Sequence, residues 1–172
     1  MKKSLPEQLK NKLFRTAGLL FCCLALAACE KDDEEPVPGT NEFLYNGKLI
    51  AVDEIYQEFY GDYYETGTHN VGLIIVSEDL SCNFYFEMFV PASSDVLLPG
   101  TYQMKDTGAQ YTFLGGIVFN ENEKKLADVT SGTIHISISG NTYTIKADCL
   151  LADGDKLAGN YTGISYWSDE RE

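Results

Sequence analysis

The alternation of polar and apolar residues in the last third of the chain is the feature that most restricts its fold. Over residues 133–138 three isoleucines alternate with polar residues, and over residues 143–149 apolar residues return at every second position. Successive side chains of a β-strand point to opposite faces, so a period of two predicts two half-buried strands. Turn sequences at 139–141 and 153–155, with a last strand at 157–166, extend this hairpin into a predicted antiparallel meander.

Most of the preceding chain also has strand-like sequences. Strands are predicted at residues 43–45, 48–52, 70–77, 81–90, 100–104 and 111–119. Asn46-Gly47 predicts a type I′ hairpin turn, and Gly115-Gly116 predicts a bulge or a close approach of a neighbouring strand. The acidic and aromatic stretch 53–64 is either a strand followed by a loop or a short helical turn, and 120–128 is a charged connection.

No segment has a sustained 3.6-residue apolar period, so the predicted fold class is all-β. We expect an antiparallel β-sandwich or barrel of about eight to ten strands. Its single domain is predicted at residues 41–172, after a signal peptide at 1–28 and an acidic, disordered tether at 29–40.

The first 28 residues have the parts of a secretory signal peptide. Basic residues precede an uncharged, mostly apolar run at 17–28, which is shorter than the roughly 20 residues of a membrane-spanning helix. Cys29 follows this run directly, and Leu26-Ala27-Ala28-Cys29 resembles the lipobox of bacterial lipoproteins. This resemblance implies cleavage before Cys29 and attachment of a diacylglyceryl lipid to its thiol. Metabolic labelling with a palmitate analogue would detect this lipid. The alternative is an ordinary signal peptide followed by a chance cysteine.

An acidic segment follows Cys29 directly. Lys31-Asp32-Asp33-Glu34-Glu35 is similar to the export tract of Bacteroidota surface lipoproteins. That similarity implies a lipid-anchored protein on the outer face of the outer membrane, with an inward-facing outer-membrane protein as the alternative. The same residues also suit a solvated tether, because like charges repel and extend the chain.

The charge of the chain excludes one class of partner. The full chain has 13 basic and 26 acidic residues, and residues 1–28 hold five basic and one acidic, so the remainder has 8 against 25, a net charge of −17. Nucleic-acid binding needs a basic surface. We therefore expect no nucleic-acid partner and a membrane contact only through the lipid.

Two cysteines remain after Cys29. Their positions in the alternation put Cys82 and Cys149 on the core-facing sides of their strands. In an oxidising compartment they would form a disulfide if their Cα atoms lie within about 7 Å. The alternative is two separate buried thiols that pack as small apolar groups.

No catalytic, cofactor or metal motif is found. His69 and His135 are the only histidines, too few for most zinc sites, and His135 lies on the predicted solvent face of a hairpin. Asp153-Gly154-Asp155 offers oxygens to calcium, but a hairpin turn of this composition needs no ion. The sequence therefore predicts a protein that is not an enzyme and that holds no metal or cofactor.

Aromatic residues are the candidate ligand contacts. Tyrosine and tryptophan combine a flat apolar face with a polar tip, which suits sugar rings and protein partners. The alternative explanation is that tyrosine simply favours β-strands. The candidates gather in two segments of the sequence and are Tyr56, Tyr60, Tyr63, Tyr64, Tyr166 and Trp167.

The predicted domain is similar to small β-rich lipoproteins of Bacteroidota. The shared elements are the Tyr45-Asn46-Gly47 hairpin, the Leu-Pro-Gly-Thr-Tyr segment at 98–102 and several turn motifs between residues 131 and 163. The resemblance implies fold and location and adds no catalytic residue. We expect a non-enzymatic, lipid-anchored surface module that binds a glycan or a protein partner.

Two other functions stay open. One is a calycin-like barrel that holds a small apolar ligand, although that fold usually carries Gly-x-Trp near its first strand, whereas the only tryptophan here is Trp167. The other is a hydrolase or inhibitor without a visible motif.

Overall fold

The described part of the chain is an all-β domain, as predicted. The structure is a computed structural model that describes residues 35–120 and 124–171, and no helix occurs among them. Its ten strands are β1 (Glu42–Tyr45), β2 (Lys48–Gly61), β3 (Thr68–Ser77), β4 (Cys82–Pro91), β5 (Gly100–Met104), β6 (Thr112–Asn120), β7 (Lys125–Ser139), β8 (Thr142–Leu151), β9 (Lys156–Gly163) and β10 (Ser165–Asp169).

The N-terminal features predicted from the sequence fall outside this description. The signal peptide at 1–28, the lipidation site Cys29 and most of the acidic tract precede residue 35. The chain divides between residues 35 and 36, and all ten strands belong to the second part. In the described ranges, no helix has the length and apolar character needed to cross a membrane.

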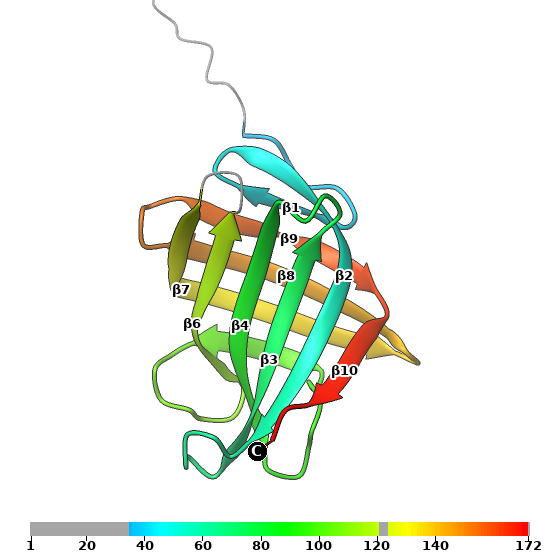
Figure 1. Cartoon of the computed structure of the whole chain (residues 1–172), viewed down its shortest axis with the longest axis vertical. Helices are drawn as coiled ribbons and strands as arrows, with labels where there is room; N and C mark the ends of the chain where they lie inside the picture. Colours follow the sequence, from blue (N-terminus) through cyan, green and yellow to red (C-terminus); the bar gives the residue numbers. More distant parts are fainter. Residues whose placement is uncertain (1–34, 121–123, 172) are drawn as a thin grey trace, which may run out of the picture. The chain divides into compact units, whose positions relative to one another are not determined.

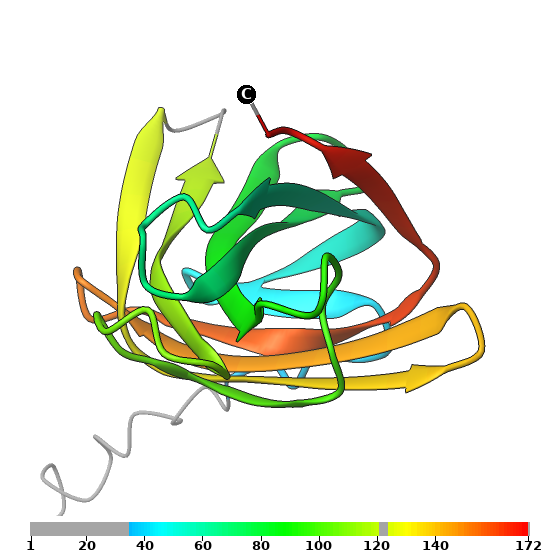
Figure 2. The same cartoon turned by 90° about the horizontal axis from the view of Figure 1, so that it is seen from below.

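Nine strands close into a barrel. Their order is β1-β9-β8-β7-β5-β6-β4-β3-β2, and the pairing of β1 with β2 closes the ring. In Figure 1, β6, β4, β3 and β2 form the near wall, and β7, β8 and β9 cross behind them. Figure 2 shows the same two walls from below. Of the two architectures left open by the sequence, the structure is therefore the barrel.

The hairpin of β1 and β2 forms one side of the closure. Asn46 and Gly47 have φ values of 51° and 68°, as a type I′ turn requires, so this predicted turn is confirmed. The other edge of β1 pairs with β9 at Gly159. A Cβ atom on Gly159 would lie 2.3 Å from the Glu42 carbonyl oxygen, so only glycine allows these two strands to approach.

The C-terminal segment differs from the prediction. Residues 157–166 are expected to be one strand, but the chain leaves β9 at Gly163 and begins β10 at Ser165. β10 runs parallel to the second half of β2, with Tyr166 opposite Tyr56. The pairing of β5 with β6 is parallel too. These two pairings depart from the predicted antiparallel arrangement. β10 pairs with the part of β2 that lies beyond its pairing with β1, and β5 pairs with the part of β6 that precedes its pairing with β7.

The ambiguous stretch 53–64 is mainly strand. β2 continues to Gly61, and residues 62–67 form the turn to β3. From Ile55 onward every second residue of β2 is buried, and these include the polar Gln57. Gln57 donates a hydrogen bond to Ser165 Oγ (2.7 Å) and accepts one from the Leu97 amide (2.8 Å), which satisfies its buried amide group.

The region of β6 and β7 confirms one prediction and corrects another. Gly115 and Gly116 both have positive φ, and the register of β4 with β6 shifts beside them, so the predicted bulge is present. The predicted connection at 120–128 is shorter than expected, because residues from Lys125 onward already pair with β6.

The inside of the barrel is filled by large side chains. All of them are at most 2% exposed, and they come from both walls. They include Phe43, Phe59, Phe84, Phe86, Met88, Tyr102 and Phe113. Leu97, in the loop between β4 and β5, is also fully buried. The interior of the described barrel is therefore a packed core.

Both cysteines are buried. Cys82 lies on β4 and Cys149 on β8, and the structure does not join the two in the disulfide considered from the sequence. β8 is separated from β4 by three strands in the sheet order. The core-facing placement of both residues agrees with their alternation, and burial raises the pKa of Cys149 to about 12.

Candidate ligand-binding surface

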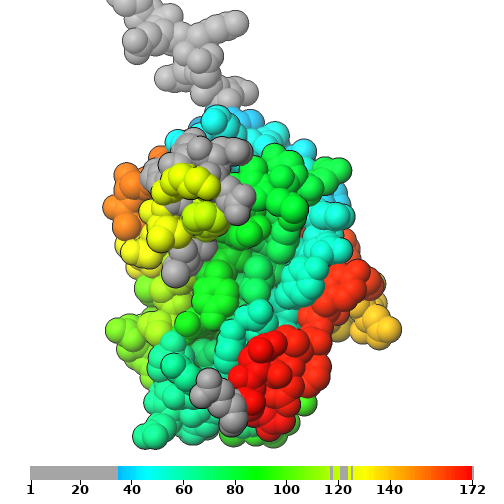
Figure 3. Space-filling model, viewed as in Figure 1, coloured from blue at the N-terminus to red at the C-terminus, as the bar shows by residue number. Residues whose placement is uncertain are grey.

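Polar and aromatic side chains gather on the outer face of the near wall. Because Ile55, Gln57 and Phe59 point into the barrel, the alternate residues Tyr56 and Tyr60 point outward. Figure 3 views this face, with β4 in green near its centre and β10 in red at the lower right. The cross-strand row Glu58, Gly72 and Glu87 runs through its middle.

Gly72 lies between two tyrosines at the centre of this face. A Cβ atom at Gly72 would lie 3.1 Å from the Tyr85 ring and 3.2 Å from the Tyr60 ring. The two rings therefore lie over the bare backbone of β3, one from each neighbouring strand. A larger residue at Gly72 would require the rings to shift by a few tenths of an ångström.

The turn between β2 and β3 adds two more tyrosines. The Asp62 carboxylate accepts hydrogen bonds from the amides of Thr66 (2.8 Å) and Gly67 (3.1 Å), which holds the turn in one conformation. Tyr63 and Tyr64 project from this turn with their rings edge to face at 5.1 Å. The turn therefore carries two exposed rings, and Tyr63 is 71% exposed.

These groups surround an open pocket of about 290 Å³. We call it the tyrosine pocket, and its lining residues are Tyr60, Tyr63, Tyr64, Asn70, Tyr85 and Glu87. Phe89, which is 2% exposed, lies beneath the Tyr64 ring at 5.7 Å. The pocket therefore combines ring faces with one carboxylate and one amide.

The phenols of the tyrosine pocket are hydrogen-bond donors. Tyr64 donates to Glu87, and Tyr60 donates to Glu58 at 2.6 Å. Burial raises the pKa of Tyr60 to about 12, and the bond to Glu58 adds to this effect. Burial and the Glu87 carboxylate likewise raise the pKa values of Tyr64 and Tyr85. All three phenols are therefore protonated at neutral pH.

Asn70 is the unusual polar group of the pocket. It lies on the outer side of β3, lines the pocket and is only 2% exposed. Its Nδ2 has no hydrogen-bond partner among the described residues. A buried donor without an acceptor costs about 1–3 kcal/mol, so such groups in folded proteins call for an explanation.

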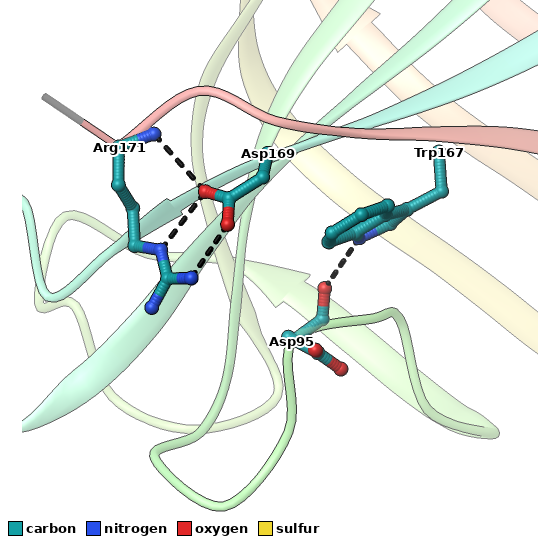
Figure 4. Close-up of polar contacts among 4 residues, drawn as sticks. All are labelled: Asp95, Trp167, Asp169 and Arg171. Carbon is teal, nitrogen blue, oxygen red and sulfur yellow. Dashed lines mark hydrogen bonds and ion pairs between the residues drawn. The ribbon is translucent and has the colours of Figure 1, made fainter.

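The other candidate aromatic residues lie apart from the pocket. Tyr166 stacks on Tyr56 at 5.3 Å, and this pair lies farther along the outer side of β2. Trp167 takes the opposite side of β10 and donates from Nε1 to the Asp95 carbonyl oxygen at 2.9 Å (Figure 4). The six predicted contacts are thus brought together as a group of three tyrosines, a separate tyrosine pair and a tryptophan tied to the β4–β5 loop.

A second, neighbouring pocket shares a wall with the first. It has a volume of about 430 Å³ and is lined by Tyr60, Gly61, Asp62, Tyr63, Glu170 and Arg171. Arg171 is held by Asp169, with Nε 2.9 Å from the carboxylate (Figure 4), and its guanidinium lies over the Phe59 ring at 4.8 Å. The two pockets therefore share Tyr60 and Tyr63, and the second pocket adds an arginine and two carboxylates.

The remaining sequence candidates do not join this surface. His69 packs against Phe59, and its Nδ1 lies 2.7 Å from the Ser94 carbonyl oxygen. His135 is 3.0 Å from the Thr101 hydroxyl on the far wall. Among residues 35–120 and 124–171, no group of three or more histidine, cysteine or carboxylate side chains is placed to hold a metal ion.

Three pocket residues are not among the sequence candidates. Tyr85 and Glu87 alternate with the buried residues Phe84, Phe86 and Met88, and this period of two is the signal that could have identified them. Asn70 gives no such signal, because it precedes an apolar run and its role depends on the neighbours that β2 and β4 place beside it.

The tyrosines allow a direct test of this arrangement by alkaline titration. Unfolded tyrosines ionise near pH 10, whereas Tyr60 and Tyr102 have pKa values of about 12 and those of Tyr64 and Tyr85 are also raised. Above about pH 10 the unfolded chain loses these protons first, so stability should fall as pH rises. The phenolate absorbance should show a group of tyrosines that ionise only well above pH 10. In Tyr85→Phe this group should contain one tyrosine fewer. Ionisation of every tyrosine near pH 10 in the folded protein would contradict it.

Comparison with known proteins adds no relative. No protein-family model, no curated protein and no solved structure matches this chain. A function can therefore be proposed only from the chemistry of the residues themselves.

Proposed function

We propose that this chain is a lipid-anchored module of the outer-membrane surface that binds a glycan or a protein partner without catalysing a reaction. The observation that carries the proposal is the tyrosine pocket. There, four tyrosine rings, a carboxylate and an amide line one concavity on the outer face of the barrel. Among these ligands we favour a glycan.

The packed interior is the reason to place the ligand outside. A calycin-like barrel would hold an apolar ligand in its centre, and the closed barrel is compatible with that fold. Here, however, the centre is occupied by fully buried rings such as Phe84 and Phe86. The tyrosine pocket and the adjoining arginine-containing pocket both open on the outer face instead.

The mixture of groups favours a glycan over a flat protein contact. A sugar has apolar C–H faces that can lie on aromatic rings and hydroxyls that both donate and accept hydrogen bonds. The pocket supplies both kinds of contact within one small concavity. A protein partner would instead use the exposed rings of Tyr63, Tyr166 and Trp167, which are 71%, 44% and 46% exposed.

The anchor is proposed from the sequence alone. Cys29 would carry the lipid, and the twelve residues between it and Glu42 would span at most about 40 Å. That length would hold the barrel close to the membrane and leave its outer face accessible. The net charge of −17 after residue 28 would keep the domain itself away from anionic lipid headgroups.

A glycan array probed with the labelled protein tests the binding function. We expect wild type to bind at least one glycan and Tyr63→Ala to lose most of that signal, because Tyr63 is an exposed wall of both pockets. Leu126→Ala is the matched control, since Leu126 is 64% exposed on β7, outside both pockets.

The array also separates the alternatives. Equal loss of signal in both variants would argue against the tyrosine pocket, and cleavage of a bound glycan would contradict the non-enzymatic assignment. If no glycan binds, capture of a specific surface protein that Tyr63→Ala fails to capture would leave the protein-partner form of the proposal.

A further inference from the structure

The buried amide of Asn70 identifies what kind of group the tyrosine pocket lacks. Asn70 is 2% exposed, and its Nδ2 finds no acceptor in the part of the chain that the structure describes. An oxygen that accepts a hydrogen bond from this nitrogen is the group that would satisfy it.

The nearby carboxylates limit the charge of that group. Glu87 lines the same pocket, and Glu58 lies across Gly72 in the same row. A carboxylate or phosphate would be repelled by these side chains, and an ammonium group has no lone pair for Asn70. A hydroxyl group suits both residues, because it can accept a hydrogen bond from Asn70 Nδ2 and donate one to the Glu87 carboxylate.

The walls of the pocket limit its shape. The tyrosine rings give flat apolar surfaces, and Asp62 holds the turn that carries two of them. A volume of about 290 Å³ lies just below the range of ligand pockets, about 300–1,000 Å³. These dimensions favour one ring over an extended chain.

We infer that the tyrosine pocket is a subsite for a single uncharged sugar ring, one hydroxyl of which bridges Asn70 Nδ2 and the Glu87 carboxylate. This inference rests on the proposed glycan function and specifies the sugar class and the two polar contacts. The sugar packs an apolar face on the tyrosine rings. The sugar hydroxyl supplies the hydrogen-bond acceptor that Asn70 Nδ2 lacks.

Saturation-transfer NMR of the full chain in detergent micelles tests this subsite. The probes are uncharged methyl glycosides of glucose, galactose, mannose and N-acetylglucosamine, with glucuronic acid and glucosamine as charged comparators. We expect at least one uncharged glycoside to bind and the charged sugars to bind more weakly. Asn70→Leu should weaken binding about tenfold, the effect of losing one hydrogen bond.

The stability of Asn70→Leu separates ligand binding from a structural role. The variant should be at least as stable as wild type, because it removes an unsatisfied buried donor. Asn83→Leu is the matched control: Asn83 Oδ1 is likewise buried and has no partner among the described residues, but Asn83 lies outside the pocket. Glu87→Gln should weaken binding, whereas Glu54→Gln should not, although each carboxylate accepts a tyrosine hydroxyl.

Several results would overturn the subsite. They are the absence of binding by any uncharged glycoside, wild-type affinity in Asn70→Leu, or tighter binding of a charged sugar. If the array signal of wild type persists but is indifferent to Asn70→Leu, the subsite is wrong and the proposed glycan function stands. If the array is blank, the glycan function itself fails.

Discussion

Replacing Phe86 by alanine is expected to lower the free energy of unfolding by about 3–5 kcal/mol. Phe86 is fully buried in the barrel and packs edge to face on Phe113 at 5.7 Å. Removing its ring would leave a cavity between the two walls. Since a domain of this size has a total stability of about 5–15 kcal/mol, the change would remove a large part of it.

Equilibrium unfolding in urea measures this loss. Tyr63→Ala serves as the control, because Tyr63 is 71% exposed and its truncation should change stability by less than about 0.5 kcal/mol. A loss below about 1 kcal/mol in Phe86→Ala would mean that the interior is loosely packed. That outcome would favour an internal ligand, as in a calycin-like barrel.

Replacing Cys29 by alanine is expected to abolish lipid attachment completely. Without its thiol the chain would lack the proposed site for the diacylglyceryl group, and the net charge of −17 after residue 28 would oppose binding of the remaining chain to anionic lipid. The protein should move from the membrane fraction to the soluble fraction. Metabolic labelling with a palmitate analogue should label wild type only.

A second cysteine provides the control for this experiment. Cys22→Ala changes a residue of the apolar run before the proposed cleavage site, so labelling should persist. An unlabelled wild-type protein, or a labelled Cys29→Ala variant, would show that the anchor has been assigned wrongly.

The local strand pattern of this fold is predictable from the sequence, but its closure is not. The alternation over 133–138 and 143–149 identifies the β7–β8 hairpin, because one face of each strand is buried. Closure of the barrel also requires β1 to pair with β9, and Gly159 allows this approach. That contact joins residues far apart in the chain, and a period of two carries no information about it.

The ambiguity over 53–64 has a physical cause. Gln57 is polar although it faces inward, and the outward-facing residues of β2 include the aromatic Tyr56 and Tyr60. Hydrophobicity therefore does not alternate along β2. The inward position is acceptable only because Ser165 and Leu97, from distant parts of the chain, satisfy the Gln57 amide.

The candidate site shows the same division. Tyr60, Tyr63 and Tyr64 are found from composition because they are close in sequence. Tyr85 and Glu87 lie on β4, which is separated from β2 by β3. Only the registers of β2 with β3 and of β3 with β4 bring these two residues close to Tyr60, on either side of Gly72. Asn70 stands out only when its missing partner is visible in the structure.

The ligand is proposed to lie in the tyrosine pocket and not inside the barrel. The most direct measurement is an NMR titration of the isotopically labelled protein with its tightest-binding array glycan. We predict that the side-chain amide of Asn70 and the backbone amides of Tyr60 and Tyr85 show the largest shifts. Largest shifts at core residues of the far wall, such as Ile134 and Ile145, would contradict the claim and place the ligand in the interior.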